Sequence, residues 1–233
     1  MIHVDLGSPR GDDIAFEGEF NFKILVVGEP SVGKTSLVRR YTNNKFSAEY
    51  KSTIGVDFSA KTINIGPGTD VTLQLWDLAG QERIGDQLAM YFREARAVII
   101  VYDITNEPSK DAVTEWKRHI DANCTVCDNP YRPPTAILCN KIDLQEPNED
   151  EALALKTLAE NTGCVLASFV SVKDDISVDE VFARLAAAAL NQEKLIEEMK
   201  KTTLSDALDN DNGIIQITDD NDDYIVEESK RCC

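Results

Sequence analysis

Residues 28–35, with the sequence GEPSVGKT, place two glycines, a lysine and a hydroxyl group in one short stretch. Glycine lets the backbone curl its N–H groups around phosphate oxygens, because it carries no Cβ that would clash. Lys34 can reach the outer phosphates of a nucleotide, and the Thr35 hydroxyl can hold Mg²⁺. The pattern predicts a phosphate-binding loop, and the expected contacts are Glu29, Pro30, Ser31, Val32, Gly33, Lys34, Thr35 and Ser36.

The sequence on either side of this loop supports the prediction, since the motif is informative only between a strand and a helix. An apolar run precedes it at residues 24–27, and a helical pattern follows through Leu37, Val38 and Tyr41. The amino end of that helix would add free N–H groups and partial positive charge. An ordinary glycine-rich turn is the alternative, and the two flanking elements argue against it.

A second stretch, residues 140–143 (NKID), separates the possible nucleotides. It directly follows an apolar run at residues 135–139, and ligands bind where parallel strands end. The carboxylate of Asp143 can accept from both the N1–H and the exocyclic amine of guanine. Adenine would leave that carboxylate unpaired, at a cost on the order of 1–3 kcal/mol for a buried polar group. This stretch therefore favours a guanine nucleotide over a P-loop kinase or ATPase.

Residues 76–83 (WDLAGQER) lie between these two stretches, again where a strand is expected to end. Asp77 can hold Mg²⁺ through water, and Gly80 can offer its N–H to the γ-phosphate. Gln81 can orient the water that attacks this phosphate. The three stretches together predict a GTPase that converts GTP and water to GDP and phosphate, with GTP or GDP and Mg²⁺ as cofactors.

The elements that position these stretches alternate between strand and helix patterns. Such alternation is typical of an α/β fold with a mostly parallel sheet covered by helices on both faces. A hairpin is expected at residues 66–69 and a long polar loop at residues 44–55. The six predicted strands are residues 22–28, 56–65, 71–76, 97–102, 135–140 and 164–170, and the helices are residues 35–43, 109–123, 149–160 and 178–200.

Charge divides the chain into three parts. The net charge is −17, of which residues 1–20 carry −4 and residues 191–233 carry −7. The first of these parts shows no sustained apolar period, so we expect a disordered acidic extension at residues 1–20. Residues 191–233 should hold the end of the last helix and an acidic tail, whose apolar patches suit either disorder or short recognition segments. Residues 21–190 carry only −6, which argues against nucleic-acid binding through clustered Lys and Arg.

The chain has six cysteines and no apolar run long enough to span a bilayer, which favours free thiols in the cytosol. Cys124 and Cys127 are spaced like a metal or redox pair. However, no second pair or nearby histidine completes a ligand set. The final two residues, Cys232 and Cys233, are more informative.

The set GEPSVGKT, Thr53, DLAGQE and NKID resembles the Ras superfamily of small GTPases over about residues 21–190. Residues 50–58 (YKSTIGVDF), WDLAGQER and the terminal Cys-Cys resemble the Rab branch. Leu78 and the Glu29 loop are similar to a Rab subgroup linked to lysosome-related and endosomal compartments. The resemblance implies a monomeric P-loop GTPase G domain that acts as a molecular switch, recruiting effectors to a vesicle membrane in its GTP state.

The resemblance implies further site roles, residue by residue. Thr53 matches a threonine that ligates Mg²⁺ and donates its N–H to the γ-phosphate, so it joins Gln81 and Lys34 as catalytic. Phe46 would lie against the guanine edge, with a core phenylalanine as the alternative. The remaining implied contacts to the base are Asn140, Lys141, Asp143, Ser171, Val172 and Lys173. The implied effector surface is Ile54, Gly55, Phe58, Trp76 and Tyr91, although Trp76 also suits a core position.

Cys232 and Cys233 resemble the double geranylgeranylation site of Rab proteins. One lipid chain binds membranes only marginally, and an acidic tail is repelled by an anionic leaflet, so both cysteines should be modified. Two unmodified thiols are the alternative. The implied location is the cytosol and the cytoplasmic face of endosomal, lysosome-related or other vesicle membranes. The implied partners are an exchange factor, a GTPase-activating protein, a GDP-dissociation inhibitor, a prenyltransferase escort and effectors.

Two departures from the family pattern keep other interpretations open. Pro30 occupies the loop position closest to the γ-phosphate and Gln81, and it lacks an N–H and fixes φ near about −65°. A GTP-bound scaffold with little or no hydrolysis is therefore the alternative function. Ile84 stands where phenylalanine is usual, which leaves the identity of the effectors open.

Overall fold

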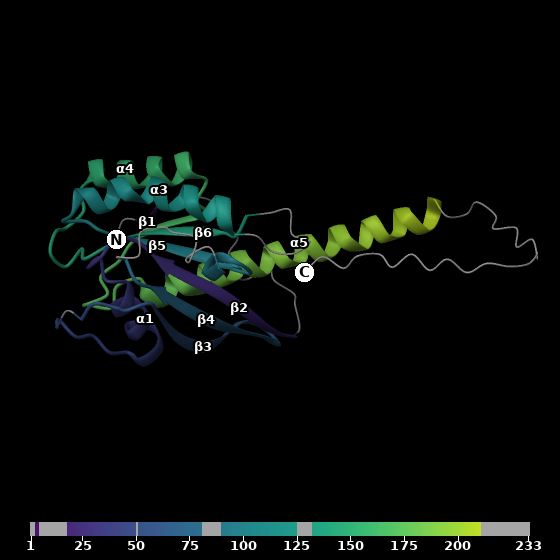
Figure 1. Cartoon of the computed structure of the whole chain (residues 1–233), viewed down its shortest axis with the longest axis horizontal. Coiled ribbons are helices and arrows are strands. Elements are labelled where there is room, and N and C mark those ends of the chain that lie inside the picture. The colour runs from purple at the N-terminus through teal and green to yellow at the C-terminus, as the bar shows by residue number, and fades with distance from the viewer. Residues whose placement is uncertain (1–2, 5–17, 50, 81–89, 125–131, 211–233) are drawn as a thin grey trace, which may run out of the picture. The chain divides into compact units, whose positions relative to one another are not determined.

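The computed structural model describes residues 3–4, 18–49, 51–80, 90–124 and 132–210. Met1–Ile196 form one compact unit, and Glu197–Cys233 form a second. In the first unit a sheet lies between two layers of helices (Figure 1). The helices are α1 (Lys34–Asn43), α3 (Glu107–Asn123), α4 (Glu149–Thr162) and α5 (Val178–Asn210), the last of which continues into the second unit.

The sheet has the strand order β1-β7-β6-β5-β2-β4-β3. The pairs from β7 through β4 are parallel, while β3 is antiparallel to β4 and β1 is antiparallel to β7. The predicted α/β class and the six strands of the mostly parallel sheet are confirmed as β2 to β7. The strands are β1 (His3–Val4), β2 (Gly18–Val27), β3 (Val56–Gly66), β4 (Thr69–Leu78), β5 (Ala97–Asp103), β6 (Thr135–Asn140) and β7 (Leu166–Phe169).

The central strand β2 contributes to both hydrophobic layers, because successive side chains in a strand point to opposite faces. Ile24 and Val26 pack with residues of α1 and α5, whereas Leu25 and Val27 pack with residues of α3 and α4. All four side chains are fully buried. Burial on both faces explains the continuous apolar run in the sequence. Because β2 is parallel to its neighbours, the loop that follows it lies at the carboxyl edge of the parallel strands.

The three largest differences between the predicted and observed boundaries lie toward the ends of the chain. His3–Val4 pair with β7, although residues 1–20 were expected to be disordered. Strand β2 begins at Gly18, because residues 18–21 pair in register with β4, although Phe20 is the one apolar side chain among them. Helix α5 continues to Asn210, well beyond the predicted end near residue 200. The strands extend beyond the apolar pattern because their backbones pair with neighbouring strands, and α5 extends beyond it because a helix, once formed, continues through polar residues.

The described cysteines are buried within this framework. Cys124, Cys139 and Cys164 are free thiols, and burial raises the pKa of Cys124 to about 12. Cys127 lies outside the described residues. Within the described ranges, no group of three or more His, Cys, Asp or Glu side chains is placed to hold a metal ion. Nor is any helix in those ranges long and apolar enough to cross a membrane.

Candidate functional site

The predicted phosphate loop connects β2 to α1, and its geometry requires both flanking glycines. Gly28 has a φ of 138° and Gly33 a φ of 102°, conformations that side chains rarely adopt. A Cβ on Gly28 would lie 2.2 Å from the Val101 carbonyl oxygen, and one on Gly33 would lie 2.4 Å from Nδ2 of Asn140. The loop is therefore packed tightly against the carboxyl ends of β5 and β6.

Lys34 is held inside this loop, with only 6% of its surface exposed. Its Nζ donates to the carbonyl oxygens of Gly28 and Glu29, at 2.8 Å each. Burial lowers the pKa of Lys34 to about 8, while the carboxylates of Asp77 and Glu29 oppose this shift. The amine is therefore mostly protonated at neutral pH, and an anion bound against the loop would stabilise its charge further.

The three predicted magnesium ligands come together beside the loop. The Thr35 hydroxyl lies 2.7 Å from the Thr53 hydroxyl and donates to Oδ2 of Asp77 at 2.5 Å. Asp77 is 1% exposed, and its Oδ1 has no hydrogen-bond partner among the described residues. Burial raises the pKa of Asp77, partly offset by the Thr35 hydrogen bond and by Lys34. These oxygen donors are the type that Mg²⁺ prefers.

Gly80 closes the loop from the side of β4. A Cβ at this position would lie 2.6 Å from both the Lys34 Nζ and the backbone nitrogen of Pro30. Only glycine allows this approach, so the Gly80 backbone faces the position where an outer phosphate is expected. Gln81, the predicted water-orienting residue, lies outside the described residues.

Asn140 connects the phosphate loop to the predicted base loop. Its Nδ2 donates to the Val32 carbonyl oxygen at 2.8 Å, and its Oδ1 accepts from the Val172 N–H at 3.3 Å. The residue is 2% exposed. The structure therefore gives Asn140 a role in joining two loops, and the N–H of Val172, a predicted base contact, is engaged in this long hydrogen bond.

The Asp143 carboxylate is fixed by residues 171–173. Oδ1 accepts from the Ser171 hydroxyl at 2.9 Å, and Oδ2 lies 3.3 Å from the Lys173 Nζ. The Asp143 side chain is only 6% exposed. Ser171 in turn accepts from the N–H of Asp174 at 3.0 Å. Ser171 and Lys173 therefore fix the orientation of this carboxylate.

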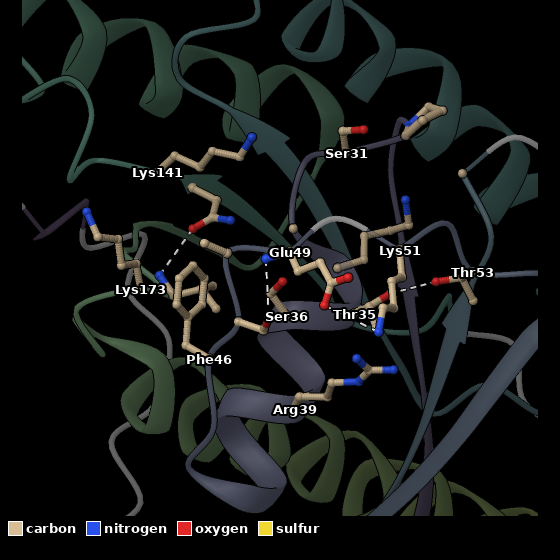
Figure 2. A pocket seen from close by; sticks show the side chains of 18 of the residues that line it. Ser31, Thr35, Ser36, Arg39, Phe46, Glu49, Lys51, Thr53, Lys141 and Lys173 are labelled. Atoms are coloured by element: carbon tan, nitrogen blue, oxygen red, sulfur yellow. Dashed lines mark hydrogen bonds and ion pairs between the residues drawn. The ribbon is translucent and has the colours of Figure 1, made fainter.

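A cavity of about 550 Å³ joins the phosphate loop to the Asp143 carboxylate, within the usual size of a small-molecule site. In Figure 2, Phe46, Lys141 and Lys173 lie toward one end and Thr35 and Thr53 toward the other. Phe46 is 38% exposed, which excludes the alternative of a core phenylalanine. The predicted contacts that line the cavity are Pro30, Ser31, Gly33, Lys34, Thr35, Ser36, Phe46, Thr53, Gly80, Asn140, Lys141, Asp143, Val172 and Lys173.

The predicted effector residues lie on β3, β4 and the segments beside them. The Phe58 ring meets the Trp76 ring edge-on, with centroids 4.4 Å apart, and Trp76 lies 6.1 Å from Tyr91. Phe58 is 57% exposed and Ile54 is 93% exposed, whereas Trp76 is half-buried against the α3 and α4 core. Trp76 therefore combines the surface and core roles, and Gly55 lies beside Ile54 with a φ of 71°.

Sequence reasoning missed several residues at the site. Arg40 on α1 donates from Nε to the Val172 carbonyl at 2.9 Å and from Nη2 to the Lys173 carbonyl at 2.8 Å. Asp103 at the end of β5 forms an ion pair with Lys141. No local motif marks either residue, because their partners lie far away in the sequence. Further cavity-lining residues that were missed are Arg39, Lys45, Ser47, Ala48, Glu49, Lys51, Ser52 and Leu144.

A phosphate loop after a central parallel strand, with a buried carboxylate two strands away, defines the class of P-loop guanine-nucleotide-binding proteins. The model of the Ras family matches residues 23–191, and the chain belongs to this family.

Three relatives narrow the assignment. Ras-related protein Rab-32A of Dictyostelium discoideum is 48% identical over 54% of this chain and 58% of its own length. Ras-related protein Rab-32 of Homo sapiens is 33% identical over 92% of this chain and 90% of its own length. Ypt/Rab-type GTPase YPT7 of Saccharomyces cerevisiae is 35% identical over 80% of this chain and 89% of its own length. The resemblance to the Rab branch and to the subgroup predicted from the sequence is confirmed.

The chain is thus a Rab-type small GTPase, a GTP-binding switch of vesicle trafficking that hydrolyses GTP to GDP. Its family membership does not favour the alternative of a scaffold without hydrolysis. Regulators and effectors act on members of this family in general, and prenylation and membrane association are typical of Rab proteins.

Proposed function

We propose that the cavity holds the guanine base against Asp143 and the phosphates against residues 28–35. The observation that carries this proposal is that one cavity contains two recognition groups, the Asp143 carboxylate for the base and the Lys34 ammonium group for the phosphates. The Asp143 carboxylate is oriented by Ser171, and Lys34 lies buried inside the phosphate loop. Phe46 and Lys141 would cover the base, while Val172 and Lys173 would approach its edge.

The cluster of Thr35, Thr53 and Asp77 fits a magnesium ion. Its oxygen donors suit a hard cation, and the unpartnered Oδ1 of Asp77 is a buried acceptor that a metal-bound water could satisfy. Held by these residues, Mg²⁺ would supply positive charge to offset the negative charge of the phosphates. We assign Thr35 and Thr53 as direct ligands and Asp77 as a ligand through water.

For hydrolysis, the protein mainly supplies positioning and charge stabilisation. Lys34 would hold the outer phosphates, and the Gly80 N–H would contact the γ-phosphate. Gln81 would orient the attacking water, and the Thr53 N–H would donate to the γ-phosphate. Contacts to that phosphate would hold residues 44–58 and 78–92 in one arrangement, and their loss on hydrolysis would release the surface of Phe58, Trp76 and Tyr91 that effectors recognise.

The base assignment is tested by the substitution Asp143→Asn. An amide offers a donor to the 2-position, so it suits the carbonyl of xanthine and opposes the exocyclic amine of guanine. We expect GDP affinity to fall at least about a hundredfold, with XDP binding gained. Competition binding with GDP, XDP and ADP measures this change. Loss of GDP binding without any gain for XDP would contradict base readout by Asp143.

The terminal residues Cys232 and Cys233 lie outside the described residues, and we propose that both carry geranylgeranyl groups. Two lipid chains would compensate for the acidic tail that precedes them. Mass spectrometry of the chain isolated from membranes should then show two prenyl groups, and a single group or none would contradict the proposal.

We further propose the cytosol and the cytoplasmic face of endosomal or lysosome-related membranes as the location. An exchange factor, a GTPase-activating protein, a GDP-dissociation inhibitor, a prenyltransferase escort and effectors would be the partners. The similarity to the Rab-32 proteins and to YPT7 supports this placement within the Rab family. Colocalisation of the tagged chain with markers of these membranes would test it.

A further inference from the structure

Asp103 is a buried carboxylate just behind the wall of the cavity. It is the last residue of β5 and is paired in register with Asn140 at the end of β6. Its Oδ1 accepts from the N–H and the hydroxyl of Thr105, at 2.9 Å and 2.7 Å, and its Oδ2 lies 2.6 Å from the Lys141 Nζ. The side chain is only 8% exposed. Thr105 therefore holds one oxygen of Asp103, while the other oxygen pairs with Lys141.

The charge of Asp103 is maintained despite its burial. Burial raises the pKa of this carboxyl group, but hydrogen bonds from Lys141 and Thr105 outweigh burial and hold the pKa below its ordinary value. The carboxylate is thus ionised at neutral pH and carries the charge that pairs with the Lys141 ammonium group.

Lys141 is constrained at both ends. Its backbone has a φ of 67°, a left-handed conformation that the adjoining turn maintains through the hydrogen bond from the Leu144 N–H to the Lys141 carbonyl at 2.9 Å. Its ammonium group is held by Asp103. Lys141 lies at the same end of the cavity as Phe46 (Figure 2), and Asp143 lines this cavity too. A lysine stem offers an apolar surface to a ring.

We propose that Asp103 is a positioning residue, which fixes the Lys141 stem as one wall of the base pocket. This inference rests on the proposed function, since it assumes that a guanine base occupies the space between Lys141 and Phe46. Asp103 does not itself line the cavity and therefore acts through Lys141. A lysine released from Asp103 would sample several rotamers, and the bound nucleotide would have to order it on each binding event.

The test is a double-mutant cycle on the release rate of a fluorescent GDP analogue from the full chain. The variants are Asp103→Asn, Lys141→Met and the combination of both. Asn keeps the size of Asp103 and can still accept from Thr105, while Met keeps the apolar stem of Lys141. Asp111→Asn, an exposed carboxylate on α3, serves as the matched control.

We expect Asp103→Asn and Lys141→Met each to speed release by about tenfold. The double variant should release no faster than Lys141→Met alone, because Asp103 acts only through that lysine. GTP should be affected by the same factor as GDP, since the change lies at the base. The control should match the wild type.

Multiplicative effects in the double variant would overturn the proposal, because general loosening of the fold would act independently of Lys141. Normal release from Asp103→Asn would overturn it as well. If the proposed base site itself were wrong, Lys141→Met and Asp143→Asn would both leave release unchanged. That outcome is distinguishable from failure of the positioning role alone, in which Lys141→Met accelerates release and Asp103→Asn does not.

Discussion

At the scale of single residues, Pro30 is the position where this site departs most from the expected pattern. The backbone nitrogen of Pro30 lies so close to Gly80 that a Cβ on Gly80 would be only 2.6 Å from it. Pro30 therefore lies beside the Gly80 backbone, which should contact the γ-phosphate. It has no N–H to offer a phosphate oxygen. The neighbouring donors remain, because Lys34 and the Thr35 hydroxyl are held by their own hydrogen bonds. Pro30 should therefore alter the rate of hydrolysis more than nucleotide affinity.

Single residues also show what the sequence could predict. The grouping of Lys34, Thr35, Asp77 and Asp143 around one site was predictable, because each belongs to a motif with fixed local spacing at the end of a strand. Phe46 was left between two interpretations, which the exposure of its side chain at the cavity resolved against a core position.

At the scale of elements, the site depends on how α1, β5 and the base loop are joined. The six predicted strands and four helices could be placed from apolar runs, since burial on both faces dictates a continuous pattern. The contacts between elements could not. Arg40 reaches the base loop across 132 positions in the sequence, and Asp103 reaches Lys141 through neighbouring strand ends. The pairing of His3–Val4 with β7 involves too few residues to leave a periodic signal.

Arg40 gives this scale its prediction. Arg40→Met keeps the apolar stem on α1 but removes the donors to the Val172 and Lys173 carbonyls. Hydrogen bonds from a charged group contribute about 1.5–3 kcal/mol each, so GDP release should accelerate by about tenfold or more. Stopped-flow fluorescence of a bound GDP analogue measures the rate. Arg118→Met, on the exposed face of α3, is the control. Equal rates of GDP release in the two variants would exclude a role for the Arg40 hydrogen bonds.

At the scale of the whole molecule, the chain combines a compact nucleotide-binding unit with acidic terminal segments. The first unit, Met1–Ile196, contains every described residue of the candidate site. The remaining −11 of net charge outside residues 21–190 lies in the terminal segments. An anionic membrane surface repels these acidic segments. Membrane attachment should therefore depend on lipid groups and not on electrostatic attraction. The nucleotide chemistry can therefore be measured on the chain without its membrane.

Hydrolysis of bound GTP tests the central claim most directly. Single-turnover hydrolysis with Mg²⁺ should be compared between the wild type and Gln81→Leu, with GTP retention measured in parallel. We predict a slow wild-type rate, on the order of 10⁻⁴ s⁻¹, as for Ras without an activating protein. The rate should fall further in Gln81→Leu, while GTP binding remains tight. Tight GTP binding with no hydrolysis in either protein would contradict the account and would identify a GTP-bound scaffold disarmed by Pro30.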